Sequence, residues 1–325
     1  MDCVCPASRN PQSVICTQMR IASIDIGTNT VLLLVANVDK NGDIQRLAYE
    51  QRIPRLGKGV DGSRNLQTDA MQRVIGVLQE YKSIISTFNV EKTVVCGTSA
   101  VRDATNRQAF AELVHSHTGF ELEVLSGEDE AYWTYRGAIS GIPGITKATV
   151  VDIGGGSTEI TIGNDKTIID SISLDVGSVR VTERFLKHDP PTHPELEASI
   201  TLVEDELAKA GRFDFKGSTL VGVAGTATSL AILAQGLKEF SIDAIRNYRL
   251  DLDTVYLLFR ALRAMPSGEI LAQSSFMKGR HDVIVAGVLI LREIMAHFKF
   301  KEMIVSERGV RYGLVLREWE KNSKS

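Results

Sequence analysis

The chain has 325 residues, of which 43% are hydrophobic and 24% charged, a composition typical of a globular protein with room for two domains. A net charge of −3 argues against general nucleic-acid binding. The longest apolar run, residues 283–290, is far shorter than the ~20 residues of a membrane span. We therefore expect a cytoplasmic protein with neither a nucleic acid nor a membrane among its partners.

Residues 1–18 differ in composition from everything that follows. They contain three of the four cysteines (Cys3, Cys5 and Cys16) and two prolines, show no periodicity, and lack the apolar core of a signal peptide. No second Cys or His pair stands at the spacing of a zinc site. We predict a disordered N-terminal tail.

Residues 19–38 read as a strand, a glycine turn and a second strand, with a third strand over 44–51. Thr68 is expected to cap a helix over 69–88. Strands are predicted over 92–100 and 121–125, separated by a helix over 107–117.

Arg102 follows the carboxyl end of a predicted parallel strand, which is where α/β sheets bind ligands. An arginine there is suited to hold a phosphate by two parallel hydrogen bonds. A solvated salt bridge is the alternative.

The acidic turn at residues 128–131 starts another predicted helix. Acids in such a turn commonly serve only as partners of the helix dipole. Glu130 differs because it lies between the two halves of the chain, where a general base could reach a water molecule lined up on a phosphate.

Residues 150–160 form the pattern around which the chain is organised: a buried-type strand, the glycines 154–156, and a second strand. Consecutive glycines can adopt positive φ and turn their N–H groups to one side as an anion cradle. Asp152 and Glu159 flank this cradle and would repel a phosphate unless a cation such as Mg²⁺ lay between. An ordinary hairpin turn is the alternative.

The same pattern occurs earlier, where Asp25 precedes a glycine turn as Asp152 does. Two such hairpins suggest two related α/β domains facing each other across a cleft. Further elements are expected in the C-terminal half: strands over 171–178, 219–224 and 303–306, helices over 181–186, 194–210, 252–265 and 282–298, and a terminal helix from 307. The small residues 225–229 open one more helix and could bring its N–H groups to a ligand.

Seven motifs in order closely resemble the exopolyphosphatase and guanosine pentaphosphate phosphatase (Ppx/GppA) family of the actin/Hsp70 superfamily. They lie at residues 25–30, 98–106, 126–131, 152–159, 177–184, 225–229 and 306–311. The resemblance covers about residues 19–316. Longer family members carry an additional C-terminal His-Asp-type region, so we expect the short two-domain form. Glu307 departs from the aspartate usual in the family.

The resemblance implies two ribonuclease H-like α/β domains, domain I over 19–135 and 308–325 and domain II over 136–307, facing each other across a cleft. It implies Glu130 as the water-activating base and Asp152 and Glu159 as metal ligands. The implied phosphate-binding residues are Asp25, Gly27, Thr28, Asn29, Thr30, Arg102, Gly154, Gly155, Gly156, Ser157 and Thr158.

The expected function is Mg²⁺-dependent hydrolysis of the terminal phosphoanhydride of inorganic polyphosphate, which needs a base, a cation and N–H donors. Hydrolysis of guanosine pentaphosphate (pppGpp) is the alternative within the same chemistry. An ATP-binding module like a kinase or chaperone is the alternative from another class. The substrate is thus polyphosphate or a phosphorylated guanosine nucleotide, and a homodimer is left open.

Overall fold

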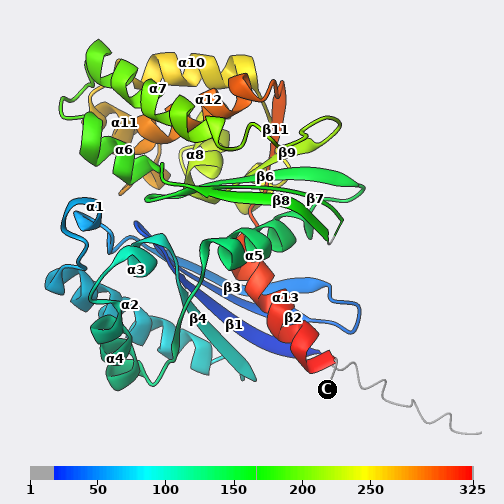
Figure 1. The fold of residues 1–325 in the computed structure, drawn as a ribbon. Coiled ribbons are helices and arrows are strands. Elements are labelled where there is room, and N and C mark those ends of the chain that lie inside the picture. The colour runs from blue at the N-terminus through cyan, green and yellow to red at the C-terminus, as the bar shows by residue number, and fades with distance from the viewer. Residues whose placement is uncertain (1–17, 166, 324–325) are drawn as a thin grey trace, which may run out of the picture.

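The computed structural model describes residues 18–165 and 167–323, and its strands form two sheets (Figure 1). The predicted tail lies outside the described residues except for Gln18. The strands are β1 (Met19–Ile26), β2 (Val31–Val38), β3 (Ile44–Arg52), β4 (Lys92–Gly97), β5 (Leu122–Val124), β6 (Lys147–Ile153), β7 (Thr158–Asn164), β8 (Thr167–Leu174), β9 (Thr219–Val223), β10 (Arg249–Asp251) and β11 (Glu302–Val305).

The helices complete two α/β lobes. They are α1 (Val60–Ser63), α2 (Thr68–Ser86), α3 (Ser99–Asp103), α4 (Arg107–Thr118), α5 (Gly127–Ile139), α6 (Ser178–Phe185), α7 (His193–Ala208), α8 (Ala224–Ala234), α9 (Ile242–Ile245), α10 (Leu252–Leu262), α11 (Ser267–Gln273), α12 (Ile284–His297) and α13 (Val310–Ser323), with a 3-10 turn over Ser275–Met277.

The two sheets share one topology. The first has the order β3-β2-β1-β4-β5, in which β1 to β3 form an antiparallel meander and β4 and β5 run parallel to β1. The second has the order β10-β11-β9-β6-β7-β8, in which β6 to β8 repeat the meander and β9 and β11 repeat the parallel strands. This repeated order is that of a ribonuclease H-like domain and confirms the predicted fold class.

Each sheet is covered by helices on apolar faces. Helices α2 and α4 pack on one face of the first sheet, and α13 packs on the other. Helices α6 to α8 and α10 to α12 lie on the face of the second sheet that points away from the first lobe (Figure 1). We call these the first lobe (β1–β5 with α1–α4 and α13) and the second lobe (β6–β11 with α6–α12). The predicted domain limits stay a proposal.

Helices α5 and α13 cross at a contact that only glycine permits. A Cβ on Gly137 would overlap the carbonyl oxygen of Gly309, and a Cβ on Gly313 would overlap the carbonyl oxygen of Trp133. The two passages of the chain between the lobes therefore lie against each other through bare backbone.

The structure corrects some local predictions. The N-cap of α2 is Gln67 rather than Thr68, which is the first helical residue. The strand predicted to reach residue 100 ends at Gly97, and α3 follows, so Arg102 is helical. Helix α10 ends at Leu262 instead of 265, and Pro266 disfavours helical backbone at Met265, the last residue of the predicted helix. Helices α9 and α11 were not predicted.

Among residues 18–165 and 167–323, no helix is long and apolar enough to cross a bilayer. The cytoplasmic location stays a prediction.

Candidate active site

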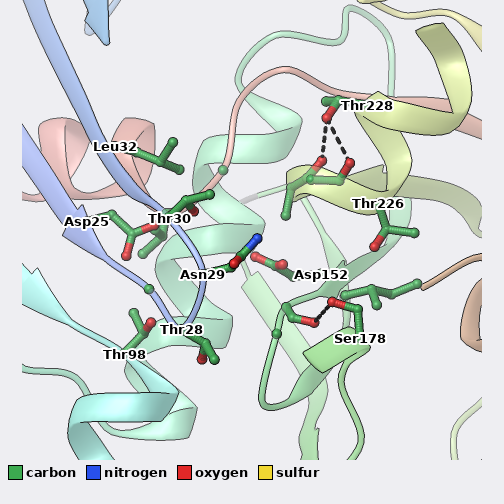
Figure 2. A pocket seen from close by; sticks show the side chains of 18 of the residues that line it. Asp25, Thr28, Asn29, Thr30, Leu32, Thr98, Asp152, Ser178, Thr226 and Thr228 are labelled. Atoms are coloured by element: carbon green, nitrogen blue, oxygen red, sulfur yellow. Dashed lines mark hydrogen bonds between the residues drawn. The ribbon is translucent and has the colours of Figure 1, made fainter. Parts of the chain in front are cut away.

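A cavity of about 150 Å³ lies between the lobes, where the carboxyl ends of strands from both sheets meet. Figure 2 shows side chains from both hairpins, among them Asp25, Asn29 and Asp152, pointing into it. The N-terminus of α8 adds Thr226 and Thr228 to its wall. The cavity is thus built from both copies of the repeated fold, which is where the paired hairpins predicted a site.

The two hairpin turns present free backbone donors. In the first turn, the N–H groups of residues 28–30 donate no hydrogen bond to any described residue. The same holds for the N–H groups of residues 155–157 in the second turn. Buried or half-buried N–H groups without acceptors are costly unless a ligand supplies one. These turns therefore suit the oxygens of a phosphate.

The glycines of the second turn do not adopt positive φ, so that part of the prediction is wrong. They are needed for close approach instead. A Cβ on Gly155 would come within 2.8 Å of the Thr28 Cβ, and a Cβ on Gly156 would overlap the Ser99 hydroxyl. The glycines let the first lobe press directly onto the second turn.

Asp152 and Glu159 face each other across the β6–β7 pair. Glu159 is 2% exposed and accepts a hydrogen bond from the Ser173 hydroxyl at 2.6 Å. Burial, together with the charge of Glu159, raises the pKa of Asp152 well above its usual value, and burial also raises the pKa of Glu159. Two carboxylates that are costly to ionise without a counterion are a reason to expect a cation.

This donor set fits a hard divalent ion such as Mg²⁺, because both groups offer carboxylate oxygens. In the part of the chain that the structure describes, no three His, Cys, Asp or Glu side chains are placed to bind one ion. Water and phosphate oxygens would therefore have to complete the coordination, which is the usual way in which proteins hold Mg²⁺.

Glu130 lies in the first turn of α5 and is 7% exposed. Its carboxylate accepts a hydrogen bond from the Arg102 guanidinium at 2.7 Å. Burial and the charge of Glu159 raise the pKa of Glu130 well above its usual value, while Arg102 opposes the shift. The ion pair with Arg102 fixes where this carboxylate points.

Asp25 lines the cavity at the end of β1. Its Oδ1 atom is buried and has no hydrogen-bond partner among the described residues. Burial raises the pKa of Asp25 to about 6, against the opposing charge of Arg311. An orphaned carboxylate oxygen of this kind indicates that a water molecule or a ligand is to be accommodated there.

Most of the predicted site residues line the cavity: Asp25, Gly27, Thr28, Asn29, Thr30, Glu130, Asp152, Gly154, Gly155, Gly156 and Ser157. Arg102, Thr158 and Glu159 are not in the lining. Thr158 is fully buried and donates its hydroxyl to the Val176 carbonyl at 2.6 Å, which is a structural bond. The Arg102 guanidinium pairs with the Glu130 carboxylate. The contact of Arg102 with a phosphate therefore stays a prediction.

Thr226 and Thr228, from the segment 225–229 that was predicted to bring N–H groups to a ligand, also line the cavity. Lining residues that sequence reasoning did not assign to the site include Tyr49, Thr98, Ser99, Ser178, Phe276 and Arg280. Thr98, Ser99 and Ser178 follow strands within quoted motifs, so their position could have identified them. Nothing local marks the others.

Aromatic and cationic side chains from both lobes stack along one wall. Phe240 stacks on Tyr49 (ring centroids 6.1 Å apart) and on Phe276 (4.9 Å). Arg280 lies 4.0 Å over the Phe276 ring, and Arg311 lies 4.4 Å over the Tyr49 ring. Arg280 is 7% exposed, makes no ion pair within the described chain, and has its pKa lowered to about 10 by burial. A buried cation without a carboxylate partner favours an anionic ligand.

Ion pairs hold the lobes together on the flanks of the cavity. Arg180 on α6 bonds to Asp61 (2.6 Å) and Asp103 (3.0 Å) in the first lobe. Arg55 makes a two-pronged contact with Asp282 at 2.6 and 2.9 Å. Ion pairs therefore bridge the two lobes on the flanks of the cavity.

The comparisons with known proteins agree with this geometry. Exopolyphosphatase 2 of Mycobacterium tuberculosis is 34% identical over 91% of this chain and 98% of its own length. A family member from Aquifex aeolicus has a crystal structure with a TM-score of 0.81, at 33% identity, over 95% of this chain and 100% of that one.

A guanosine-5'-triphosphate,3'-diphosphate pyrophosphatase of Vibrio atlanticus is 33% identical over 67% of this chain, which spans less than half of that protein (44%). The sequence pattern of the Ppx/GppA phosphatase family matches residues 34–322. The chain belongs to the Ppx/GppA phosphatase family.

Proposed function

We propose that this protein is an exopolyphosphatase, which hydrolyses the terminal phosphoanhydride of inorganic polyphosphate and releases orthophosphate. The observation that carries the proposal is the pair of turns with unused N–H groups facing one cavity that also holds the buried carboxylate of Glu130. The similarity to an exopolyphosphatase over nearly the whole chain supports it.

Different residues bind the phosphoryl group, activate the water and hold the rest of the substrate during an in-line attack by water. The terminal phosphoryl group binds in the two turns, whose N–H groups donate to its oxygens and stabilise charge that develops there. Glu130 accepts a hydrogen bond from the attacking water and takes its proton, and Arg102 keeps the carboxylate in place. Arg280 binds a phosphate further along the chain.

Asp152, with Glu159 beside it, would hold the Mg²⁺ ion. When bound, the ion supplies positive charge that offsets the phosphate oxygens and both carboxylates. A cytoplasmic location and action without nucleic acid or membrane belong to the same proposal.

The decisive test is Glu130→Gln, which keeps the shape of the side chain and removes the base. Phosphate release from polyphosphate should fall by ~10²–10⁴-fold, the usual contribution of a general base, while substrate binding persists. Glu128→Gln is the control, since Glu128 lies in the same helical turn but is exposed. Near-native release by purified Glu130→Gln protein would contradict the assignment.

Hydrolysis of pppGpp is a second candidate, and the aromatic wall favours it. Tyr49 and Phe276 both line the cavity and could stack on a purine. Competition between equal concentrations of pppGpp and polyphosphate, followed by product analysis, decides between the two substrates. Micromolar ATP binding without any phosphate release from either substrate would favour the ATP-binding alternative.

A further inference from the structure

A second cavity, of about 680 Å³, lies in the second lobe at the opposite end of its sheet from the active-site cavity. It is lined by the segments that lead into β6, β9 and β11, namely residues 142–147, 215–220 and 298–302. These three strands are parallel, and their other ends reach the active site. We call this the distal cavity. Its volume falls in the range of ~300–1,000 Å³ that is usual for small-ligand sites.

The rim of the distal cavity is basic. Lys147, Lys216, Arg249, Lys299 and Lys301 contribute to its lining, whereas Glu302 is the only carboxylate in that lining.

Two of these cations have protein partners. Lys147 lies 3.5 Å from the Asp214 carboxylate and donates to the carbonyls of Asp214 and Lys216, and Arg249 pairs with Glu302. Lys216, Lys299 and Lys301 form no ion pair within residues 18–165 and 167–323. These three lysines are exposed, and Asp214, whose pKa the charge of Lys216 helps to lower, offsets part of their charge. The remaining cluster of positive charge favours an anionic ligand.

The floor of the distal cavity is aromatic. The ring of Phe215 lies 4.1 Å from that of Phe298 and 5.7 Å from that of Phe300, centroid to centroid. Phe215 and Phe298 are only partly buried and so are open to a ligand. An apolar floor weakens the hydration of nearby ammonium groups and strengthens their attraction for an anion.

Lys299 has an unusual backbone conformation. This residue follows the end of α12 with φ of 61°, a left-handed conformation that glycine adopts freely and that costs another residue about 1 kcal/mol. A lysine at a helix C-terminus can be explained by the helix dipole alone. That explanation does not extend to Lys216 and Lys301, which lie outside helices and face the same cavity.

We propose that the distal cavity binds a phosphoanhydride chain through Lys216, Lys299 and Lys301. Ammonium groups bind phosphates as point charges and tolerate a flexible chain. The chain can come from inorganic polyphosphate or from the polyphosphate tail of a nucleotide, whose base would then stack on the phenylalanine floor. The site is independent of the chemistry proposed for the active-site cavity.

The test compares two double variants with the same change of net charge. Lys216→Glu/Lys301→Glu alters the distal cavity, and Lys40→Glu/Lys92→Glu alters two exposed lysines of the first lobe that have no ion pair among the described residues. The probes are methylene-bridged, non-hydrolysable analogues of tripolyphosphate and of GTP, so that turnover at the active site has no influence. Calorimetry gives stoichiometry and affinity, and hydrogen exchange at 142–147, 215–220 and 298–302 gives the location.

The control variant should bind two molecules of analogue and show protection of all three segments. The distal variant should lose this protection, and its second binding step should weaken by about tenfold or more. Tighter binding of the GTP analogue than of the tripolyphosphate analogue identifies a nucleotide ligand, and equal binding identifies the inorganic chain. Absence of protection of the three segments in the control variant, or unchanged protection in the distal variant, overturns the proposal, whereas one bound molecule that protects them shows a distal site without binding at the active site.

Discussion

The two hairpins share the sequence Asp-Ile-Gly and the same place in their sheets, yet their glycines serve different purposes. A Cβ on Gly27 would meet nothing closer than the Thr30 carbonyl at 3.3 Å. A Cβ on Gly155 would meet the Thr28 Cβ at 2.8 Å, across the boundary between the lobes. The Thr28 side chain of the first hairpin packs directly on the backbone of Gly155 in the second. One motif therefore carries two different packing requirements.

The aspartates of the two hairpins also differ. Asp25 is buried near Arg311, which limits the rise of its pKa to about 6. For Asp152, the neighbouring charge of Glu159 adds to burial, and the pKa of Asp152 is raised well above its usual value. An ionised carboxylate is therefore less stable at Asp152 than at Asp25. A bound cation is accordingly needed more at the second hairpin than at the first.

The largest expected effect tests this difference. Removal of divalent ions with EDTA should lower phosphate release by at least ~100-fold, since a bound cation supplies several kcal/mol of charge stabilisation, and Mg²⁺ should restore it. Asp152→Asn should raise the Mg²⁺ concentration needed for half-maximal activity, and Asp25→Asn should shift that concentration less, because Asp25 acts on Asp152 only through its charge. Full activity in excess EDTA would contradict the cation requirement, and an equal shift in both variants would remove the distinction between the hairpins.

The next effect concerns the glycines. Gly155→Ala should push the hairpins apart and reduce kcat by about 100-fold, because displacements of about 1 Å at a reacting group have effects of that size. Gly27→Ala should cost less than about tenfold, since its surroundings need shift only slightly. Both variants should show native circular dichroism. Similar losses in the two variants would mean that the glycines act through local turn geometry, as the sequence alone predicted.

Asp25 gives a prediction about stability. Its folded-state pKa of about 6 exceeds the ordinary 3.8, so the folded protein holds this proton more tightly than the unfolded chain. Stability therefore falls as pH rises from about 4 to about 6 and stays lower above that. Asp25→Asn removes this penalty and should raise the free energy of unfolding at pH 7 by up to about 3 kcal/mol, while gaining little at pH 4. Urea unfolding at both pH values measures it, and a gain of equal size at both would exclude titration of Asp25 as the cause.

The repeated fold was predictable from sequence because each copy has its own local signals. The strand, glycine turn and strand around Asp25 and again around Asp152 require only a period-2 pattern and a turn, and both hairpins were found in place. Asp152 and Glu159 lie beside the second turn, and their assignment as metal ligands, like that of Glu130 as the base, stays a proposal.

Contacts between elements far apart in the sequence could not be predicted in this way. The pairing of Arg102 with Glu130 depends on how α3 and α5 pack, and 28 residues separate the two in sequence. The ion pairs of Arg180 with Asp61 and Asp103 cross between lobes, and no periodicity encodes such a contact. The role of Gly155 was assigned to its φ angle because a sequence shows the turn but not the Thr28 side chain that presses on it.

The aromatic wall is the clearest case of a feature without a sequence signal, since its rings come from β3, from the segment after α8 and from the 3-10 turn at 275–277.

The aromatic wall yields the smallest predicted effect. Tyr49→Ala should lower kcat/KM for pppGpp by about three- to tenfold more than for tripolyphosphate, as ring stacking contributes ~0.5–1.5 kcal/mol. Tyr49→Phe keeps the ring and should preserve the preference, although it loses the hydroxyl that accepts a hydrogen bond from Arg311 at 3.2 Å. Tyr256→Ala, at an exposed ring on α10, is the control. If Tyr49→Ala lowers kcat/KM equally for both substrates, the wall supports the cavity without contacting a base, and inorganic polyphosphate becomes the better substrate assignment.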